Sequence, residues 1–253
     1  FSIGLRQAIS LIRQETARRQ VEMQTGAMAD AGLTLGSSVG RVSTLASDIS
    51  RIESIASANK ISGARLEVTQ ASLEAVKTGL ETLTGTLGAG VQTSQLKALA
   101  AESARNSLAG FASAFNVSLN GEHVFAGINS SVRPFADNTG LQAVAEIDAA
   151  FFAHFGFAKT DAAAASISSA DFQTFLSTQV DPIFDGAIWG TAISTASDEE
   201  IRGRIEFGIA DSVSVTANET AIRSTFYASS IVAAFIDQPF NQDVLDNALG
   251  SAV

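Results

Sequence analysis

The chain has 253 residues, 46% of them hydrophobic and 17% charged, with a formal net charge of −10 and no cysteine. Its length supports one large domain or two small ones, and its acidic balance disfavours nucleic acid and anionic membranes as partners. Without cysteine it has no disulfide and no zinc–thiolate site, and no apolar run reaches the roughly 18 residues of a membrane span.

The first predicted element is a helix over residues 5–25, where apolar side chains recur every three or four residues. Glycines at positions 26, 32 and 36 then end the helical pattern. The pair Arg18-Arg19 lies at helical spacing from Glu15 and Glu22, which is typical of a solvated face. The start of the chain lacks the charged, apolar and cleavage regions of a signal peptide, so we expect none to be cleaved.

A proline-free segment over residues 40–87 predicts a second, much longer helix. At 1.5 Å per residue it would be roughly 70 Å long, which suits the spine of a rod rather than a compact core. Its apolar stripe is broader than a strict two-stranded coiled coil requires, because further apolar residues such as Val76 and Leu83 lie beside it. The main stripe consists of Val42, Leu45, Ile49, Ile52, Leu66, Leu73, Leu80 and Leu87.

Glycine-rich residues 85–90 follow and predict a tight reversal into a third helix over residues 93–119. The two long helices should therefore run antiparallel. The sequence of the reversal, GTLGAG, lacks the spacing of phosphate-binding loops and joins two helices rather than a strand and a helix. We therefore expect no nucleotide cofactor there.

The segment NGEHVFAGINSSVRPF, residues 120–135, interrupts the helical pattern. It combines the turn pair Asn120-Gly121, a short apolar run, a glycine and a proline, which predicts a small β element. Residues 201–207 and 212–216 alternate apolar and polar side chains and predict two more short strands.

Residues 136–190 read as two amphipathic helices joined by an Ala/Ser-rich loop, which predicts a small inserted helical domain. Residues 217–253 are helical again, with Asn218 or Thr220 as the predicted N-cap and Pro239 as a break. Residues 1–135 and 191–253 should then form one discontinuous domain. The predicted fold is mainly α: an elongated bundle of long antiparallel helices with a small β element, in which the two chain ends meet.

The sequence offers no convincing catalytic, cofactor or metal site. His123 has only Glu122 nearby, on the opposite face of a strand. His154 lies among phenylalanines and is expected to be a core or boundary residue rather than a ligand. The acidic run Asp198-Glu199-Glu200 lacks the ligand spacing of a calcium loop and is expected to precede a strand. Three asparagines match the glycosylation triplet, which is weak support for modification in a chain so rich in Ser and Thr: Asn116, Asn129 and Asn218.

The segment 120–135 resembles the form NG-x-x-(Leu/Val)-Phe-(Ser/Ala)-Gly…Pro-Phe found in the hook–filament junction proteins of bacterial flagella, hook-associated members of the flagellin family. The matching residues are Asn120, Gly121, Val124, Phe125, Ala126, Gly127, Pro134 and Phe135. Residues 25–36 and 212–223 are similar to the stretch after the family's first helix and to the entry of its C-terminal helix. The resemblance does not extend to residues 136–190.

The resemblance implies a secreted structural protein of the flagellum, exported through the flagellar type III channel without a cleavable signal. It implies as partners copies of the chain, a second junction protein, flagellin and an export chaperone, but neither nucleic acid nor membrane. Terminal segments would fold into coiled coils inside the assembly.

Three other functions remain open at this stage. An ordinary filament-forming flagellin would share most of the pattern and would differ by growing into long filaments. A signalling coiled coil would also have long Ala/Ser/Glu helices, but the β element and the insert argue against it. An enzyme acting through the insert is the least favoured alternative, because the chain has two histidines, one tyrosine and no cysteine.

Overall fold

A computed structural model describes residues 2–26, 29, 39–88, 93–185 and 188–252. The chain divides into two compact units, Phe1–Ser57 and Ala58–Val253, with the boundary inside one helix. The first unit contains α1 (Ser2–Thr25) and the start of α3 (Val39–Gly88). Both helices confirm the predicted ones. The connection over residues 26–36 falls largely outside the described residues. Of the predicted reversal at 85–90, residues 85–88 belong to α3 and residues 89–90 lie outside the described residues.

The second unit begins within α3 and is mainly helical. Its α-helices are α4 (Ser94–Phe115), α5 (Thr139–Phe155), α6 (Ser169–Phe175), α7 (Asp181–Phe184), α8 (Thr220–Phe235) and α9 (Gln242–Ala252). Short helices of other types are η2 (Ala162–Ser166, 3-10), η3 (Leu176–Val180, π) and η4 (Trp189–Ile193, π). Two antiparallel hairpins complete the described part: β1 (Ser118–Leu119) with β2 (Glu122–His123), and β3 (Arg202–Glu206) with β4 (Ile209–Ser212). The predicted mainly α fold is confirmed.

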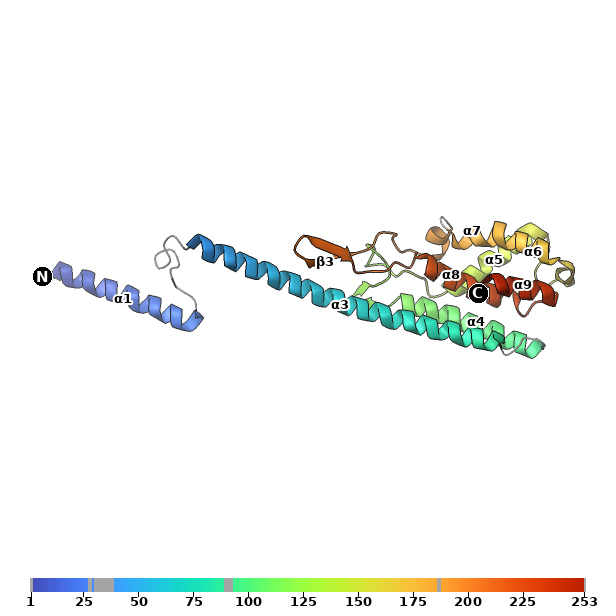
Figure 1. The fold of residues 1–253 in the computed structure, drawn as a ribbon, viewed down its shortest axis with the longest axis horizontal. Coiled ribbons are helices and arrows are strands. Elements are labelled where there is room, and N and C mark those ends of the chain that lie inside the picture. Colours follow the sequence, from blue (N-terminus) through green and yellow to red (C-terminus); the bar gives the residue numbers. More distant parts are fainter. Residues whose placement is uncertain (1, 27–28, 30–38, 89–92, 186–187, 253) are drawn as a thin grey trace. The chain divides into compact units, whose positions relative to one another are not determined.

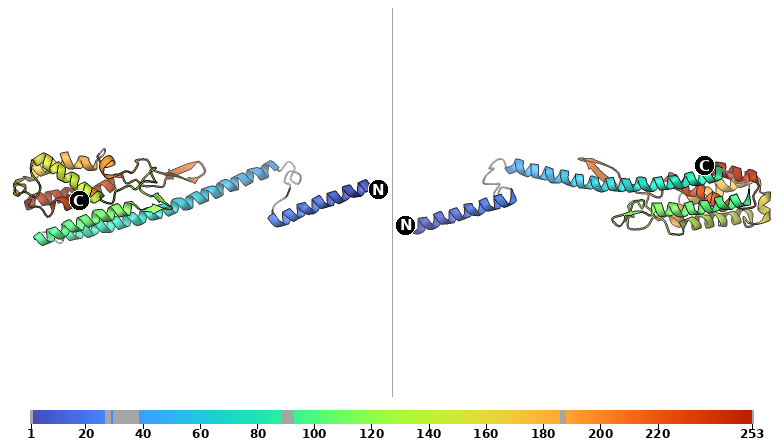
Figure 2. Two further views of the ribbon diagram at one scale, coloured as in Figure 1. Left: turned by 180° about the vertical axis from the view of Figure 1, so that it is seen from behind. Right: turned by 90° about the horizontal axis from the view of Figure 1, so that it is seen from below.

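Within the second unit, the C-terminal part of α3 and α4 lie side by side and run in opposite directions (Figures 1 and 2). The hydroxyl of Thr93 caps α4 by accepting a hydrogen bond from the Leu96 amide at 3.3 Å. α4 ends at Phe115, four residues before the predicted end at 119, because Ser118 and Leu119 pair with β2 instead.

Helix α8 lies at the centre of the second unit, where it packs against α4, α5, α7 and α9. Phe226 is fully buried and its ring lies 4.8 Å from that of Phe135 and 5.5 Å from that of Trp189. Farther along α8, the ring centroid of Phe235 lies 5.9 Å from that of Phe151 in α5. Residues 136–190 thus contribute side chains to the same core cluster as α4 and α8. The predicted division into a discontinuous domain and an insert at 136–190 stays a prediction.

Two local predictions about the C-terminal part were wrong. The second strand of the later hairpin spans Ile209–Ser212, not 212–216, because Gly208 with φ +77° closes a two-residue turn directly after Phe207. The N-cap of α8 is Glu219, without a side-chain hydrogen bond, and not Asn218 or Thr220. The predicted break at Pro239 is confirmed, since α8 ends at Phe235 and α9 starts at Gln242.

Two adjacent serines of α8 lie in this core at an energetic cost. Ser229 and Ser230 are fully buried, and neither hydroxyl oxygen has a hydrogen-bond partner among the described residues. A buried hydroxyl without a partner loses its hydration and gains nothing in exchange. Replacing Ser230 with alanine should therefore stabilise the protein by about 1 kcal/mol. Urea unfolding measures the change, with the exposed Ser113→Ala of α4 as the control; a loss of stability would contradict the burial cost.

Candidate assembly surface

In the second unit, α3 buries one face and exposes another. The buried face is largely polar or small at its start and apolar at its end, with residues at steps of three, four and seven: Arg65, Thr69, Ser72, Val76 and Leu83. Leu66 and Leu73 of the predicted main stripe are 44% and 38% exposed, whereas Val76 and Leu83, predicted beside that stripe, are only 6% and 4% exposed. The apolar stripe of the sequence thus divides between the core and the surface.

Side chains of α3 hold both hairpins. Arg65 is buried, and its Nη2 donates to the carbonyl oxygen of His123 at 3.3 Å while its Nη1 lies 3.5 Å from Glu122. Asn59 donates from Nδ2 to the carbonyl oxygen of Ile205 in β3 at 3.0 Å. Because these bonds secure the inner face of α3, its outer leucines are not needed to attach the helix to its own chain.

The outer face of α3 carries charges between its apolar residues. Lys77 forms ion pairs with Glu74 at 3.2 Å and with Glu81 at 3.9 Å. The hydrogen bond that Lys77 donates to Glu74 and the charge of Glu74, followed by the charge of Glu81, raise the pKa of Lys77 above its ordinary value. The outer face thus combines exposed leucines with charges of both signs, and a neighbour that packs on it has to match both.

A shallow groove of about 510 Å³ lies between α3 and α4. Small residues line it on both helices, including Ala75, Gly79, Ser103, Ser107 and Gly110. A Cβ added at Gly79 would lie 2.9 Å from the ring of Phe111, so this glycine lets the two helices approach closely. Small side chains along a helix pair leave room for another helix to nest on it.

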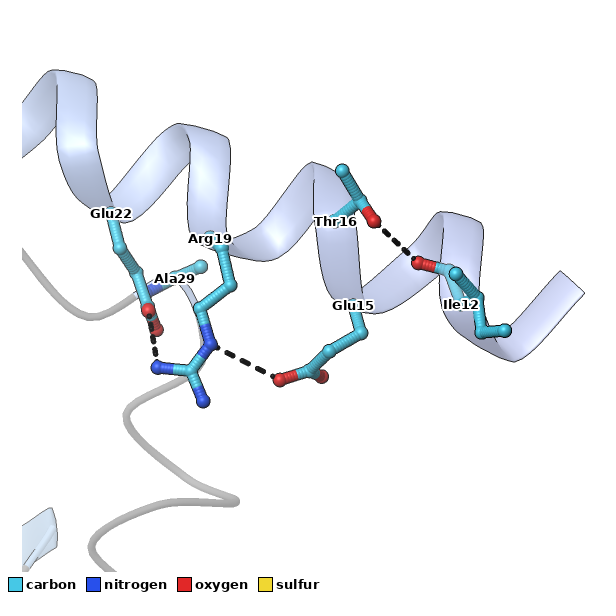
Figure 3. A network of polar contacts seen from close by, with 6 residues as sticks. All are labelled: Ile12, Glu15, Thr16, Arg19, Glu22 and Ala29. Atoms are coloured by element: carbon cyan, nitrogen blue, oxygen red, sulfur yellow. Dashed lines mark hydrogen bonds and ion pairs between the residues drawn. The ribbon is translucent and has the colours of Figure 1, made fainter. Parts of the chain in front are cut away.

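The first unit also exposes apolar side chains. On α1 these include Leu5, Ile12 and Met23, and on α3 they include Leu45 and Ile52. The predicted solvated face of α1 is confirmed for Arg19, which reaches Glu15 at 3.2 Å and Glu22 at 3.4 Å (Figure 3). Such rows of exposed large apolar residues on helices are typical of surfaces that become buried in an assembly.

The segment 120–135 forms a closely bonded β element. Asn120 and Gly121 adopt positive φ angles of 54° and 86°, as the predicted two-residue turn requires. Val124, Phe125 and Ala126 are fully buried. The backbone of this segment bonds to the later part of the chain: Ser197 N donates to Ala126 O at 3.0 Å, Ile128 N to Glu199 O at 3.0 Å, and Ala217 N to Phe125 O at 2.8 Å.

Two asparagines hold this region together by hydrogen bonds, although the sequence suggested only glycosylation triplets for both and a helix N-cap for Asn218. Asn116 pairs with the backbone of Phe135, donating to its oxygen at 2.8 Å and accepting from its amide at 2.9 Å. Asn218 accepts from Trp189 Nε1 at 3.0 Å and donates to Asp198 at 2.8 Å. Asn129 is the exposed member of the three.

The histidines and the acidic run lie apart from one another. Nδ1 of His123 is 2.8 Å from the carbonyl oxygen of Asn116. His154 is exposed and its ring lies 4.6 Å from that of Phe155, at the edge of the core as predicted. Asp198–Glu200 precede β3 in a loop, also as predicted. Within the described ranges, no three acidic or histidine side chains converge as metal ligands.

Comparison with known proteins finds a family that matches the first half of the chain. Residues 2–130, half of the chain, match the model of the bacterial flagellin N-terminal helical region. No curated protein and no solved structure matches the chain. In the part of the chain that the structure describes, no helix has both the length and the hydrophobicity of a membrane span. The matched region contains α1, α3, α4 and the first hairpin, and therefore most of the exposed apolar helix faces.

Proposed function

This chain belongs to the bacterial flagellin family, and we propose that it is the subunit that joins the flagellar hook to the filament. Family membership makes it a structural component of the flagellum that associates with copies of itself and with other flagellar subunits. The family is structural and not enzymatic, and we propose that this chain likewise has no catalytic, cofactor or metal site.

The segment 120–135 is the observation that carries the junction proposal. Its residues resemble the junction-protein form, and those that match it have defined structural roles. Asn120 and Gly121 make the turn, Phe125 and Phe135 are buried within 6.0 Å of the Phe115 ring, and Gly127 fits a position that a side chain could not occupy. An ordinary filament-forming flagellin is the alternative, since the family match covers both types.

Assembly on isolated hooks distinguishes the two functions. Added to hooks that carry the other junction protein, this chain should form a short ring or zone and then stop, and flagellin should grow only from hooks that received it. Electron microscopy measures the length of the added segment. Long filaments of this chain alone would contradict the junction role and support the ordinary flagellin.

We also propose that the two chain ends pair in the assembly, with an export chaperone covering them beforehand, and that the chain leaves the cell by the flagellar type III route. The chain has no cysteine, so one engineered cysteine pair tests directly whether the two chain ends lie together. Ile12→Cys combined with Asp246→Cys should form an intramolecular disulfide in assembled material. Ile12→Cys combined with Asp185→Cys, in a different part of the second unit, should not. Equal cross-linking in both pairs would contradict the pairing.

A further inference from the structure

A cavity of about 690 Å³ between η4 and the start of α8 takes no part in the assembly surface. It lies outside residues 2–130, which match the family model. The side chains that matter on its wall are Trp189, Asp198, Asn218, Glu219 and Arg223. Its volume falls within the range of roughly 300–1,000 Å³ that is usual for small-ligand sites.

The polar side chains of this cavity are fixed by hydrogen bonds to one another. The carboxamide of Asn218 accepts from Trp189 Nε1 at 3.0 Å and donates both to Ala196 O at 3.0 Å and to Asp198 Oδ1 at 2.8 Å. The second oxygen of Asp198 has no partner among the described residues. A ligand would thus meet groups that are already oriented, which reduces the entropy lost on binding.

The guanidinium of Arg223 is also held in place. Its Nη1 donates to Phe184 O at 3.0 Å and lies 3.2 Å from Asp185, and its Nη2 donates to the hydroxyl of Thr220 at 3.2 Å. The wall of the cavity therefore carries one cation, Arg223, and two carboxylates, Asp198 and Glu219. A ligand with a single net charge would meet a like charge on one wall, whereas hydroxyl groups can donate to the carboxylates and accept from the guanidinium.

Gly190 lines the cavity without contributing a side chain to it. Gly190 belongs to the π-helical turn η4, and a Cβ added there would meet nothing within 4 Å. Turns of this type occur often at functional sites. From the volume, the fixed donors and acceptors of both kinds and the free space at Gly190, we propose that the cavity binds a neutral saccharide unit through its hydroxyl groups.

Trp189 is the single tryptophan of the chain and lines this cavity, so a change of emission on titration can be followed at one site. The probes are neutral mono- and disaccharides, among them glucose, galactose, N-acetylglucosamine and lactose, titrated into the full chain. At least one should give a saturable change in emission with a dissociation constant of about 1 mM or below. Glycine and glutamate are titrated in parallel, as zwitterionic and anionic probes.

Matched variants make the test specific. Gly190→Leu adds a large side chain at the wall of the cavity, where a Cβ meets nothing within 4 Å, and should abolish the saturable change, whereas Gly85→Leu, at a glycine of α3 with equal space, should leave it intact. Asp198→Asn keeps an acceptor for Asn218 but removes the charge, and should weaken binding about tenfold. Circular dichroism confirms that each variant is folded.

Three outcomes would overturn the proposal: no saturable change with any saccharide at about 50 mM, far above an affinity of physiological use; unchanged binding in folded Gly190→Leu; or saturation by the amino acids but by no saccharide. None of these bears on the junction role, which is measured on hooks. The saccharide site and the proposed function can therefore fail independently.

Discussion

Replacing Gly127 with alanine should destabilise the second unit by about 4 kcal/mol, one of the largest effects open to a single methyl group. The residue has φ +61°, a left-handed conformation that costs an L-amino acid about 1–2 kcal/mol. Its added Cβ would also lie 2.4 Å from the carbonyl oxygen of Glu199 and 2.7 Å from that of Ser197. Both obstacles are backbone atoms, so no side-chain rotation relieves the overlap.

The loop at 197–199 would have to move, and it is bonded to the very segment that contains Gly127. Moving it strains the bonds from Ser197 N to Ala126 O and from Ile128 N to Glu199 O. Loss of these two bonds accounts for most of the remaining cost, at about 1 kcal/mol each.

Gly121→Ala is the matched control for this substitution. Gly121 also has a positive φ, 86°, but an added Cβ there meets nothing within 4 Å. The control should lose only about 1–2 kcal/mol, from the conformational term alone. Urea unfolding of both variants gives the difference in the free energy of unfolding. Equal losses would show that the contact with residues 197–199 adds nothing to the stability.

The same glycines show what the sequence can and cannot predict. The turn at Asn120-Gly121 was predictable because a two-residue hairpin loop needs positive φ at both positions, and few residue pairs supply it. Gly127 matched a family pattern, but a glycine is needed there because of the backbone of Ser197 and Glu199, about 70 residues later in the chain. Local pattern contains no information about that contact.

The sequence predicted that α3 has a broad apolar surface, but not which of its faces is buried. The periodicity of α3 correctly predicted a long helix with more apolar surface than one contact needs. It placed Leu66 and Leu73 on the main stripe, and the structure exposes both while burying Arg65, Thr69 and Ser72. On the buried face, Arg65 donates one hydrogen bond to the carbonyl oxygen of His123 and pairs with Glu122 of the first hairpin, and a buried arginine held in this way has no signature in hydrophobic periodicity.

The largest functional effect is expected from the double substitution Leu66→Ser with Leu73→Ser. Both side chains are partly exposed in the single chain, at 44% and 38%, so its free energy of unfolding should fall by only about 1–2 kcal/mol. In an assembly that covers this face of α3, each subunit would lose the burial of two leucines. Since less than half of each side chain is still exposed, each contributes about 1 kcal/mol, and the critical concentration for assembly should rise about 30-fold.

Two further variants serve as controls for this substitution. Leu83→Ala, on the buried face of α3, should instead lower the free energy of unfolding by about 2–4 kcal/mol, because it opens a cavity inside the chain. Leu141→Ser with Phe152→Ser removes apolar side chains of α5 that are even more exposed, at 68% and 59%, outside the region that matches the family model. It should leave the critical concentration within about twofold, a change of less than 0.5 kcal/mol. Sedimentation of assembled material measures that concentration for all variants. If the α3 and α5 pairs shift it equally, exposed hydrophobicity alone drives association. If neither shifts it, the outer face of α3 is not an interface.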